Sequence, residues 1–310
     1  MQTILGANGQ IGTELAKALK LNYTSDIRLV SRKPKKVNDT DALFVANLLD
    51  REMAFKAVEG SDIVYFTLGL PMNSQMWEEQ FPVIMQNVIA ACQAHNTKLV
   101  FFDNTYMYPQ NDKVLTEEIA FAPVGRKGKV RRQIVEMLLE AMKAKEIDAV
   151  ICRAPEFYGP GQTQSITNTF IFDAIKGGKK LKVLLRDDVL RTLIWTPDAS
   201  RAMALIGNTP DAYGQTWHLP CDDNRLTYKQ FITLVSEVYG EKFTYRVIPN
   251  WLLSIGALFV EKVKELQELL PRYGEDNIFD SSKFKKRFPD FKITAYKEGI
   301  EKIKEEQKRV

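Results

Sequence analysis

Short apolar runs alternate with amphipathic stretches along the first half of the chain. Residues 1–5 form the first run; after them Ile11, Leu15 and Leu19 share one face at helical spacing, with Lys17 and Lys20 on the other. Further apolar runs predict strands at residues 27–30, 43–46, 63–68, 99–102 and 148–152, with helices between them. This alternation indicates an α/β fold, a Rossmann-type doubly wound parallel sheet with right-handed crossovers.

A glycine-rich turn, Gly6-Ala7-Asn8-Gly9-Gln10-Ile11-Gly12, joins the first predicted strand to the first predicted helix. The first N–H groups of a helix have no partner within the helix, the helix dipole is positive there, and glycines let a ligand approach the backbone closely. The turn therefore predicts a pyrophosphate site for a dinucleotide, although a plain tight turn would look similar. The predicted contacts are Gly6, Asn8, Gly9, Gln10, Ile11 and Gly12.

The second predicted strand ends in Ser31-Arg32-Lys33. In a Rossmann unit this strand end lies beside the adenosine ribose, where an acidic residue would bind the 2′-hydroxyl and an arginine would accept a 2′-phosphate. This segment has no acidic residue, and it contains the basic residues Arg32 and Lys33. We therefore predict NADP(H) in preference to NAD(H), with Ser31, Arg32 and Lys33 as phosphate contacts; a solvated basic loop is the alternative.

Two further strand ends carry candidate site residues. The fourth strand ends in Leu68-Gly69, where a glycine leaves room for a cofactor that crosses the sheet. The fifth strand leads into polar and phenolic groups, which are catalytic candidates because they gather at the end of a central strand. These are Asn104, Thr105, Tyr106 and Tyr108. Alternatively, the tyrosines pack and Asn104 caps a turn.

The second half of the chain has a less regular pattern, typical of an α+β substrate lobe. Residues 191–195 predict a strand that returns to the sheet, and Thr227 caps a helix that ends before Gly240. The longest apolar stretch, residues 251–260, is about half the length needed to cross a bilayer and predicts a buried helix. Further elements are expected at residues 166–175, 181–185, 200–206, 217–219, 252–270 and 296–308.

These elements predict two domains, as the 310-residue length also suggests. Residues 1–155 and 187–219 are expected to form the dinucleotide-binding Rossmann domain, and residues 156–186 and 220–310 the substrate lobe. Polar side chains of that lobe are candidate substrate contacts, although a surface salt bridge is the commoner fate of such arginines. They are Gln164, Asn168, Arg186, Arg191 and Arg272.

The amino-acid composition excludes several classes of binding partner. Charged residues make up 26% of the chain with a net charge of +4 and mixed signs, so we expect no nucleic acid as a partner. The cysteines, Cys92, Cys152 and Cys221, are scattered and favour a reduced, cytoplasmic location. Two distant histidines give no metal-ligand spacing, so no metal is expected. Because Met1 already belongs to the first predicted strand, we expect no signal peptide, and no membrane partner.

Several motifs in order make the chain resemble the extended short-chain dehydrogenase/reductase family, also described as the NAD-dependent epimerase/dehydratase family. Gly6, Gly9 and Gly12 match its G-x-x-G-x-x-G loop, and residues 153–161, Arg153 to Gly161, resemble its R-x-x-x-x-Y-G-P-G stretch. Residues 193–204 and 280–283 resemble later family segments. The resemblance covers almost the whole chain, and it implies further cofactor contacts at Asn47, Leu48, Leu68, Gly69 and Pro155.

The family's catalytic set is a Ser or Thr after the fifth strand and then Tyr-x-x-x-Lys at the next helix. The phenol passes a proton, while the lysine lowers the phenol's pKa and binds the nicotinamide ribose. The resemblance assigns the lysine to Lys129, but Gly125 stands where the tyrosine belongs. Asn104 takes the Ser or Thr position, with Thr105 one place out. The chain is thus an atypical member, with Tyr106, Tyr108 and Tyr158 as replacement phenols.

These observations favour an NAD(P)(H)-dependent oxidoreductase that transfers hydride between nicotinamide and a carbonyl or hydroxyl carbon of a small substrate. One alternative is a nucleotide-sugar epimerase or dehydratase that retains its cofactor. Another is a non-catalytic NADP-binding redox sensor or scaffold, which the missing tyrosine would suit. The substrate is expected to be a small molecule, and a homodimer is compatible with the sequence.

Overall fold

The computed structural model describes residues 1–161 and 163–308, and these form two compact units. The first unit comprises residues 1–107, 126–154 and 199–219, and the second comprises residues 108–125, 155–198 and 220–310, apart from the undescribed positions. The division places residues 187–198 with the second unit, whereas the sequence suggested the dinucleotide domain for them. The predicted α/β fold with a parallel sheet is confirmed.

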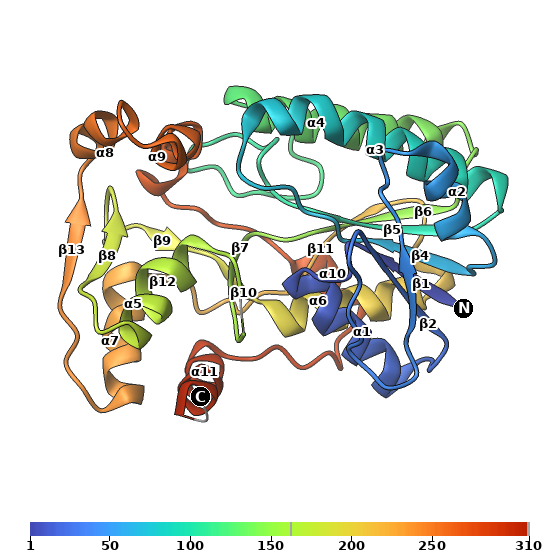
Figure 1. Ribbon diagram of the computed structural model, residues 1–310. Helices are drawn as coiled ribbons and strands as arrows, with labels where there is room; N and C mark the ends of the chain where they lie inside the picture. Colours follow the sequence, from blue (N-terminus) through green and yellow to red (C-terminus); the bar gives the residue numbers. More distant parts are fainter. Residues whose placement is uncertain (162, 309–310) are drawn as a thin grey trace. The chain divides into compact units, whose positions relative to one another are not determined.

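The first unit is built on a seven-stranded parallel sheet in the described chain, with strand order β11-β6-β5-β4-β1-β2-β3. Helices cover both of its faces (Figure 1): α1 (Gln10–Asn22) and α6 (Thr196–Gly207) lie on one side, and α2 (Arg51–Val58), α3 (Ser74–Ala94) and α4 (Gly125–Lys143) on the other. The strands are β1 (Gln2–Leu5), β2 (Ile27–Ser31), β3 (Ala42–Val45), β4 (Ile63–Phe66), β5 (Lys98–Asp103), β6 (Ala149–Arg153) and β11 (Thr216–His218).

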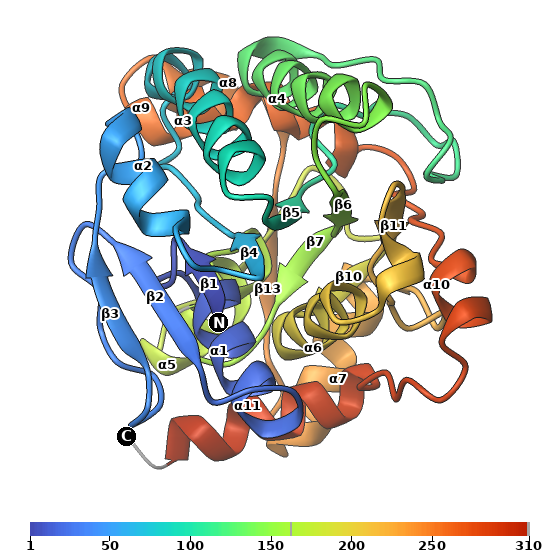
Figure 2. The same ribbon diagram turned by 90° about the vertical axis from the view of Figure 1, so that its right-hand side faces the viewer.

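Local sequence explains why the helices of this unit begin where they do. Asp50 caps α2 by accepting a hydrogen bond from Met53 N, and Asn73 caps α3 in the same way from Met76 N. α3 continues through Pro82 as a single helix. Figure 2 shows β1 and β4 in the middle of the sheet, where all their residues are buried. Because every strand is parallel, the carboxyl ends of all the strands meet at one edge.

The second unit contains three two-stranded sheets in its described part, packed with helices around an aromatic core. Tyr158, Trp195, Phe231 and Tyr296 are buried in this core. The strand pairs are β7 (Glu156–Tyr158) with β10 (Leu193–Trp195), β9 (Leu190–Arg191) with β12 (Leu226–Thr227), and β8 (Leu181–Leu184) with β13 (Tyr245–Ile248). The helices are η1 (Asn168–Phe172), α5 (Asp173–Lys176), α7 (Tyr228–Tyr239), α8 (Asn250–Ala257), α9 (Glu261–Leu266), η3 (Gln267–Tyr273), α10 (Ser282–Arg287) and α11 (Tyr296–Lys308); a short turn, η2 (Pro210–Ala212), precedes β11.

The elements predicted for the second half of the chain agree with the structure at α7 and differ from it at β10 and at residues 251–260. Thr227 forms the capping box of α7, and Gly240 ends that helix with φ +71°, as expected. The strand predicted at 191–195 does not return to the sheet, because β10 pairs in parallel with β7, the strand that follows β6 in the sequence. The buried helix predicted at 251–260 is wrong, because Leu258 and Phe259 are 78% and 82% exposed. No described helix is long and apolar enough to cross a membrane.

Candidate functional site

The glycine turn of the first unit is packed too tightly for side chains at two positions. Gly6 has φ +88°, and a Cβ there would lie 2.5 Å from Leu68 Cα. A Cβ on Gly12 would lie 2.8 Å from Ala7 Cα. Gly9, by contrast, is exposed and has room for a Cβ, so its lack of a side chain is not required by the packing of the chain. The turn thus brings Gly6 against Leu68 and leaves Gly9 open.

The same turn lies against the end of β2. Asn8 Nδ2 donates a hydrogen bond to Lys33 O over 2.7 Å, and Lys35 N donates to Asn8 Oδ1 over 3.3 Å. Ser31 Oγ accepts from Lys33 N, while the side chains of Arg32 and Lys33 are exposed. The structure therefore brings the predicted pyrophosphate and 2′-phosphate contacts together on one surface.

Helix α1 begins within this turn. Its N-terminal cap, Gly9, forms no side-chain capping bond, and the first turn carries no acidic residue. Gln10 is half-buried, and Ile11 is buried beneath it with its carbonyl accepting a hydrogen bond from Ser200 Oγ over 3.0 Å. The positive end of the helix dipole thus faces outward without a competing carboxylate in that turn, which suits a phosphate.

The segment after β3 is held by helix α3. Asn87 Nδ2 donates to Leu48 O over 2.9 Å and to Leu49 O over 3.2 Å. Leu48 is buried and Asn47 is exposed. Asn87 is therefore a support for the segment that resembles the adenine-binding stretch. At the end of β4, Gly69 is exposed with open space where a Cβ would stand.

Two arginines fix the ends of β5 and β6. Asp103 is fully buried and accepts hydrogen bonds from Arg131 Nη2 over 2.5 Å and from Arg153 Nε over 2.8 Å. Asp103 and Arg153 are also paired in register between the two strands. This ionic cluster holds α4 against the end of β5, and so it fixes the backbone from which Asn104, Thr105 and Tyr106 emerge.

Lys127, rather than Lys129, points into the first unit. Lys127 is fully buried on α4, and its Nζ donates to Ser74 Oγ over 2.9 Å. Lys129 lies on the same helix but is exposed. The difference follows from helical phase, because Lys127 shares the apolar face of α4 with Val130 and Ile134. That spacing was visible in the sequence and could have identified Lys127.

The residues after β5 divide between the two units. Asn104 Oδ1 accepts a hydrogen bond from Tyr106 N, and Thr105 is buried. Tyr106 is half-buried and stacks on Trp77, with ring centroids 6.0 Å apart and planes 10° apart. Tyr108 is fully buried in the second unit, where its ring approaches Phe121. Asn104, Thr105 and Tyr106 thus belong to the first unit, whereas Tyr108 packs within the second.

The environment of Tyr158 argues against its role as a catalytic acid. Its ring packs against Trp195, Phe231 and Tyr296, and burial raises the pKa of its phenol well above the usual value. Pro155, which was predicted to contact the cofactor, is buried and begins the second unit after β6.

Gly125 stands at the position that the resemblance gives to the family's tyrosine. It has φ +78°, and a Cβ there would lie 2.6 Å from Glu268 Cβ. An L-residue would be strained at this φ and would also collide with Glu268. The local backbone and its contact with Glu268 therefore favour glycine here.

The candidate substrate contacts of the second unit are largely occupied by internal bonds. Arg191 is buried and donates to Glu156 Oε2 over 2.9 Å, while Glu156 Oε1 accepts from Tyr228 and Tyr273 over 2.8 and 3.0 Å. Asn168 donates to Gly159 O, and Arg186 pairs with Asp188 on the surface. The carbonyl of Arg272 accepts from Arg191, and Gln164 is exposed.

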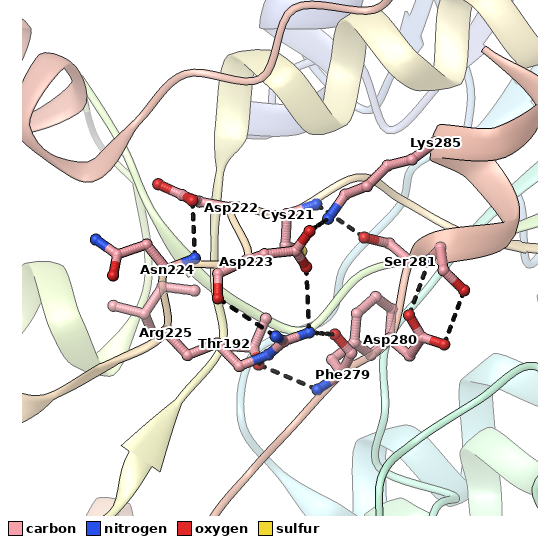
Figure 3. Close-up of polar contacts among 12 residues, drawn as sticks. Thr192, Cys221, Asp222, Asp223, Asn224, Arg225, Phe279, Asp280, Ser281 and Lys285 are labelled. Atoms are coloured by element: carbon pink, nitrogen blue, oxygen red, sulfur yellow. Dashed lines mark hydrogen bonds and ion pairs between the residues drawn. The ribbon is translucent and has the colours of Figure 1, made fainter. Parts of the chain in front are cut away.

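A second polar cluster in this unit fastens the segment that follows β11 (Figure 3). Asp223 pairs with Lys285 of α10 over 2.7 Å and with Arg225 over 3.5 Å. Arg225 also donates to Phe279 O and to Thr192 Oγ1. These contacts hold residues 221–225 to α10, to Phe279 and to Thr192, which lies between β9 and β10, so the cluster has a structural role.

Comparison with known proteins gives the family. A model described as the NAD dependent epimerase/dehydratase family matches residues 3–219. The chain belongs to this family. The family match contains the glycine turn, the β5 end, α4 and all of the parallel sheet except Gln2, so the resemblance stated from sequence is confirmed.

Solved structures of family-like epimerases share the fold over nearly the full length. UDP-glucuronic acid 4-epimerase from Bacillus cereus, in complex with NAD, has a TM-score of 0.80 at 16% identity and covers 100% of this chain and 99% of that one. UDP-glucose 4-epimerase from Thermus thermophilus, also with NAD, has a TM-score of 0.77 at 15% identity, with 99% of each chain covered. At these identities the likeness concerns the fold alone.

A curated relative matches a smaller part of the chain. The uncharacterized protein y4nL from Sinorhizobium fredii is 29% identical over 144 residues, which are 46% of this chain. The match spans 39% of the length of that relative. It therefore adds no activity to the family assignment.

Proposed function

We propose that the protein is an NAD(P)(H)-dependent oxidoreductase that transfers hydride between nicotinamide and a carbonyl or hydroxyl carbon of a small substrate. The glycine turn, the uncapped start of α1 and the open Gly69 fit a dinucleotide. When bound, the nicotinamide would supply or accept the hydride. The protein's own task is then to align the substrate and to move one proton to or from its oxygen.

The observation that carries the catalytic part of this proposal is the common support of Lys127 and Tyr106. Lys127 donates to Ser74, and Tyr106 stacks on Trp77. Ser74 and Trp77 are three residues apart in the first turn of α3, and residues at this spacing share a helix face. Trp77 is itself anchored by a hydrogen bond from its Nε1 to Pro71 O. The lysine and the phenol are therefore tethered to one helical turn.

In this proposal Tyr106 and Lys127 replace the family's Tyr-x-x-x-Lys pair. The Tyr106 hydroxyl would donate its proton to the substrate oxygen during reduction, and a nearby ammonium would favour the phenolate that remains. Lys127 would act on the phenol from its buried position, where Ser74 holds its Nζ. Lys129, which is exposed, would keep the ribose-binding role that the resemblance implies. Asn104 and Thr105 would hold the substrate oxygen.

The test combines cofactor binding with turnover. NADPH and NADH binding is measured by fluorescence, and oxidation of each is followed across a panel of carbonyl substrates. Tyr106→Phe is expected to reduce turnover by about a hundredfold or more with unchanged cofactor affinity, because general acid catalysis contributes on this scale. Lys127→Met should lower turnover and Lys129→Met should weaken cofactor binding, whereas Lys143→Met, at an exposed lysine farther along α4, is the control and should alter neither. Unchanged turnover in Tyr106→Phe would reject Tyr106 as the acid.

A nucleotide-sugar epimerase or dehydratase is the second candidate, since the solved structures cover nearly the whole of this chain and include NAD complexes. Such an enzyme would retain its cofactor through each turnover. Nucleotide that co-purifies and resists dialysis would favour it, and release of oxidised cofactor in proportion to product would favour the reductase. Tight binding without turnover on any substrate would favour the redox sensor.

The preference for NADP(H) is a further part of the proposal. Arg32 and Lys33 are exposed beside the glycine turn, and Asn8 holds the backbone of Lys33 there. These side chains could bind a 2′-phosphate, and no ion pair recorded in the described part of the chain would have to break. Small molecules therefore remain the expected ligands of this unit.

A further inference from the structure

The loop between β4 and α3, residues 67–73, begins against the glycine turn. Thr67 N and Thr67 Oγ1 both donate to the last carbonyl of β1, over 2.9 and 3.1 Å. Leu68 packs on the turn, because its Cα lies 2.5 Å from the place where a Cβ on Gly6 would stand. Gly69 follows directly and is exposed. The start of this loop is therefore fixed, and the open glycine comes next.

Trp77 of α3 holds the other end of the loop. Its Nε1 donates a hydrogen bond to Pro71 O over 2.8 Å, and Asn73 N donates to the same carbonyl over 2.7 Å. A carbonyl oxygen has two lone pairs, so it can accept both bonds. Asn73 in turn caps α3, the helix on which Trp77 lies. Gly69 thus lies two residues away from a backbone group that the indole of Trp77 holds.

The same indole carries the ring of Tyr106. The two ring centroids are 6.0 Å apart and the planes differ by 10°. Aromatic rings that lie parallel at such a distance attract each other in an offset stack. Trp77 is 5% exposed, whereas Tyr106 is half-buried, so the indole is the inner ring of the pair. One side chain therefore contacts both the loop and the candidate acid.

Trp77 is also held from within the first unit. Its ring meets Phe81 edge to face, with centroids 5.0 Å apart. The guanidinium of Arg131 lies 5.4 Å from the centroid of Phe81, and Arg131 is bonded to Asp103 at the end of β5. A ring enclosed in this way has little freedom to move independently of its neighbours. A shift of Pro71 is therefore transmitted to the Tyr106 ring through the indole.

We propose that Trp77 is a positioning residue that couples the loop around Gly69 to Tyr106. A dinucleotide that contacts this loop fixes Pro71, and the hydrogen bond from Nε1 then fixes the indole on which the phenol is stacked. Cofactor binding and alignment of the acid favour each other, since both depend on the same side chain. The proposal rests on the proposed function, in which Tyr106 is the acid, and adds the residue that aligns it.

Two variants of Trp77 separate its two contacts. Trp77→Phe keeps an aromatic ring beside Tyr106 but removes the donor to Pro71 O. Trp77→Leu removes both the donor and the aromatic ring, and it leaves an apolar side chain in the core. Binding of NADPH and NADH is measured by cofactor fluorescence, and kcat and KM are measured on the carbonyl panel at saturating cofactor.

Trp217 provides a matched control in the same unit. It is 4% exposed, and its Nε1 donates to Ala212 O over 2.9 Å, so Trp217→Phe removes a bond of the same kind. Trp77→Phe and Trp217→Phe should therefore lose a similar amount of thermal stability. A purely structural role for Trp77 predicts that these two variants also bind cofactor and turn over alike.

The coupling predicts a different result for each variant. Trp77→Phe is expected to bind the dinucleotide about threefold or more weakly with a kcat close to wild type, because the loop loses one hydrogen bond while the stack remains. Trp77→Leu should show the same loss of affinity and a kcat lower by about tenfold or more with little change in the substrate KM, since a misplaced acid slows the reaction. Trp217→Phe should change neither quantity.

Three results would decide against the proposal. Equal dinucleotide affinity in Trp77→Phe and Trp217→Phe would overturn the coupling, and this measurement needs no turnover. A wild-type kcat in Trp77→Leu, together with an inactive Tyr106→Phe, would overturn it while leaving Tyr106 as the acid. Unchanged turnover in Tyr106→Phe would instead reject the acid of the proposed function and, with it, the role of Trp77 in aligning that acid.

Discussion

Lys127 Nζ donates a hydrogen bond to Ser74 Oγ over 2.9 Å, and both residues are buried in the first unit. The bond joins α4 to the first turn of α3. It places a buried cation on α4 two residues before the exposed Lys129.

Removal of the Ser74 hydroxyl should destabilise the protein. Ser74→Ala deletes a buried acceptor of a charged donor, and such hydrogen bonds are worth about 1.5–3 kcal/mol. Urea unfolding should show a loss of stability in that range. Ser25→Ala, at an exposed serine in the same unit, is the control and should unfold like the wild type. An equal stability of both variants would show that the bond is energetically unimportant.

Gly9 and Gly12 of the glycine turn should respond differently to replacement by alanine. Gly9→Ala has room in the packed chain, so it should keep the stability but weaken dinucleotide binding, because its methyl group would face the ligand. Gly12→Ala should cost about 1–3 kcal/mol of stability through overpacking against Ala7. Thermal unfolding and fluorescence titration with NADPH distinguish the two effects. Full affinity in Gly9→Ala would argue against a pyrophosphate at this turn.

Arg32, which directly follows β2, should determine whether the protein prefers NADPH or NADH. Arg32→Ala is expected to lower the affinity for NADPH by about tenfold or more and leave that for NADH nearly unchanged, since a charge-assisted bond to the 2′-phosphate would be lost. Arg51→Ala, an exposed arginine on α2, should leave both affinities unchanged. Paired titrations with the two cofactors measure the ratio. A loss of equal size for both cofactors would contradict the assignment.

The buried carboxylate of Glu156 should matter for the stability of the second unit. Glu156→Ala leaves Arg191 buried without its carboxylate, and breaking such a pair costs about 3–5 kcal/mol. Glu136→Ala breaks an exposed pair with Arg132 and should cost at most about 1 kcal/mol. Chemical unfolding of both variants tests this difference.

The tyrosines around Glu156 predict a loss of stability at alkaline pH. Burial, and then the Glu156 carboxylate, raise the pKa of Tyr228 and Tyr273 well above the usual value. Above about pH 10 the unfolded chain releases phenolic protons that the folded chain still holds, so the free energy of unfolding should fall as pH rises. Urea unfolding between neutral and alkaline pH measures the slope. Tyr228→Phe should make this slope shallower, and an unchanged slope would contradict the prediction.

Most of the sheet could be predicted from local pattern. The apolar runs and the helical spacing of Ile11, Leu15 and Leu19 depend on residues close in sequence, and they indicated the parallel α/β fold. The pairing of β10 with β7 could not be predicted in this way, because a short apolar run does not specify its partner strand.

The glycine turn was also predictable, because Gly12 is required by its contact with Ala7 within one strand-turn-helix unit, although Gly6 depends as well on Leu68 at the end of β4. The packing of α4 was not predicted. The lysine that is buried on this helix is Lys127, and Gly125 lies against the distant Glu268.

The sequence by itself thus determined the parallel sheet, the position of the phosphate turn and the family, because these depend on short-range periodicity and motif order. Only the tertiary structure decided which lysine of α4 is buried, which tyrosine joins it at the first turn of α3, and that residues 251–260 face outward. Burial depends on partners that lie far away along the chain, such as Ser74 for Lys127 and the aromatic core for Leu253.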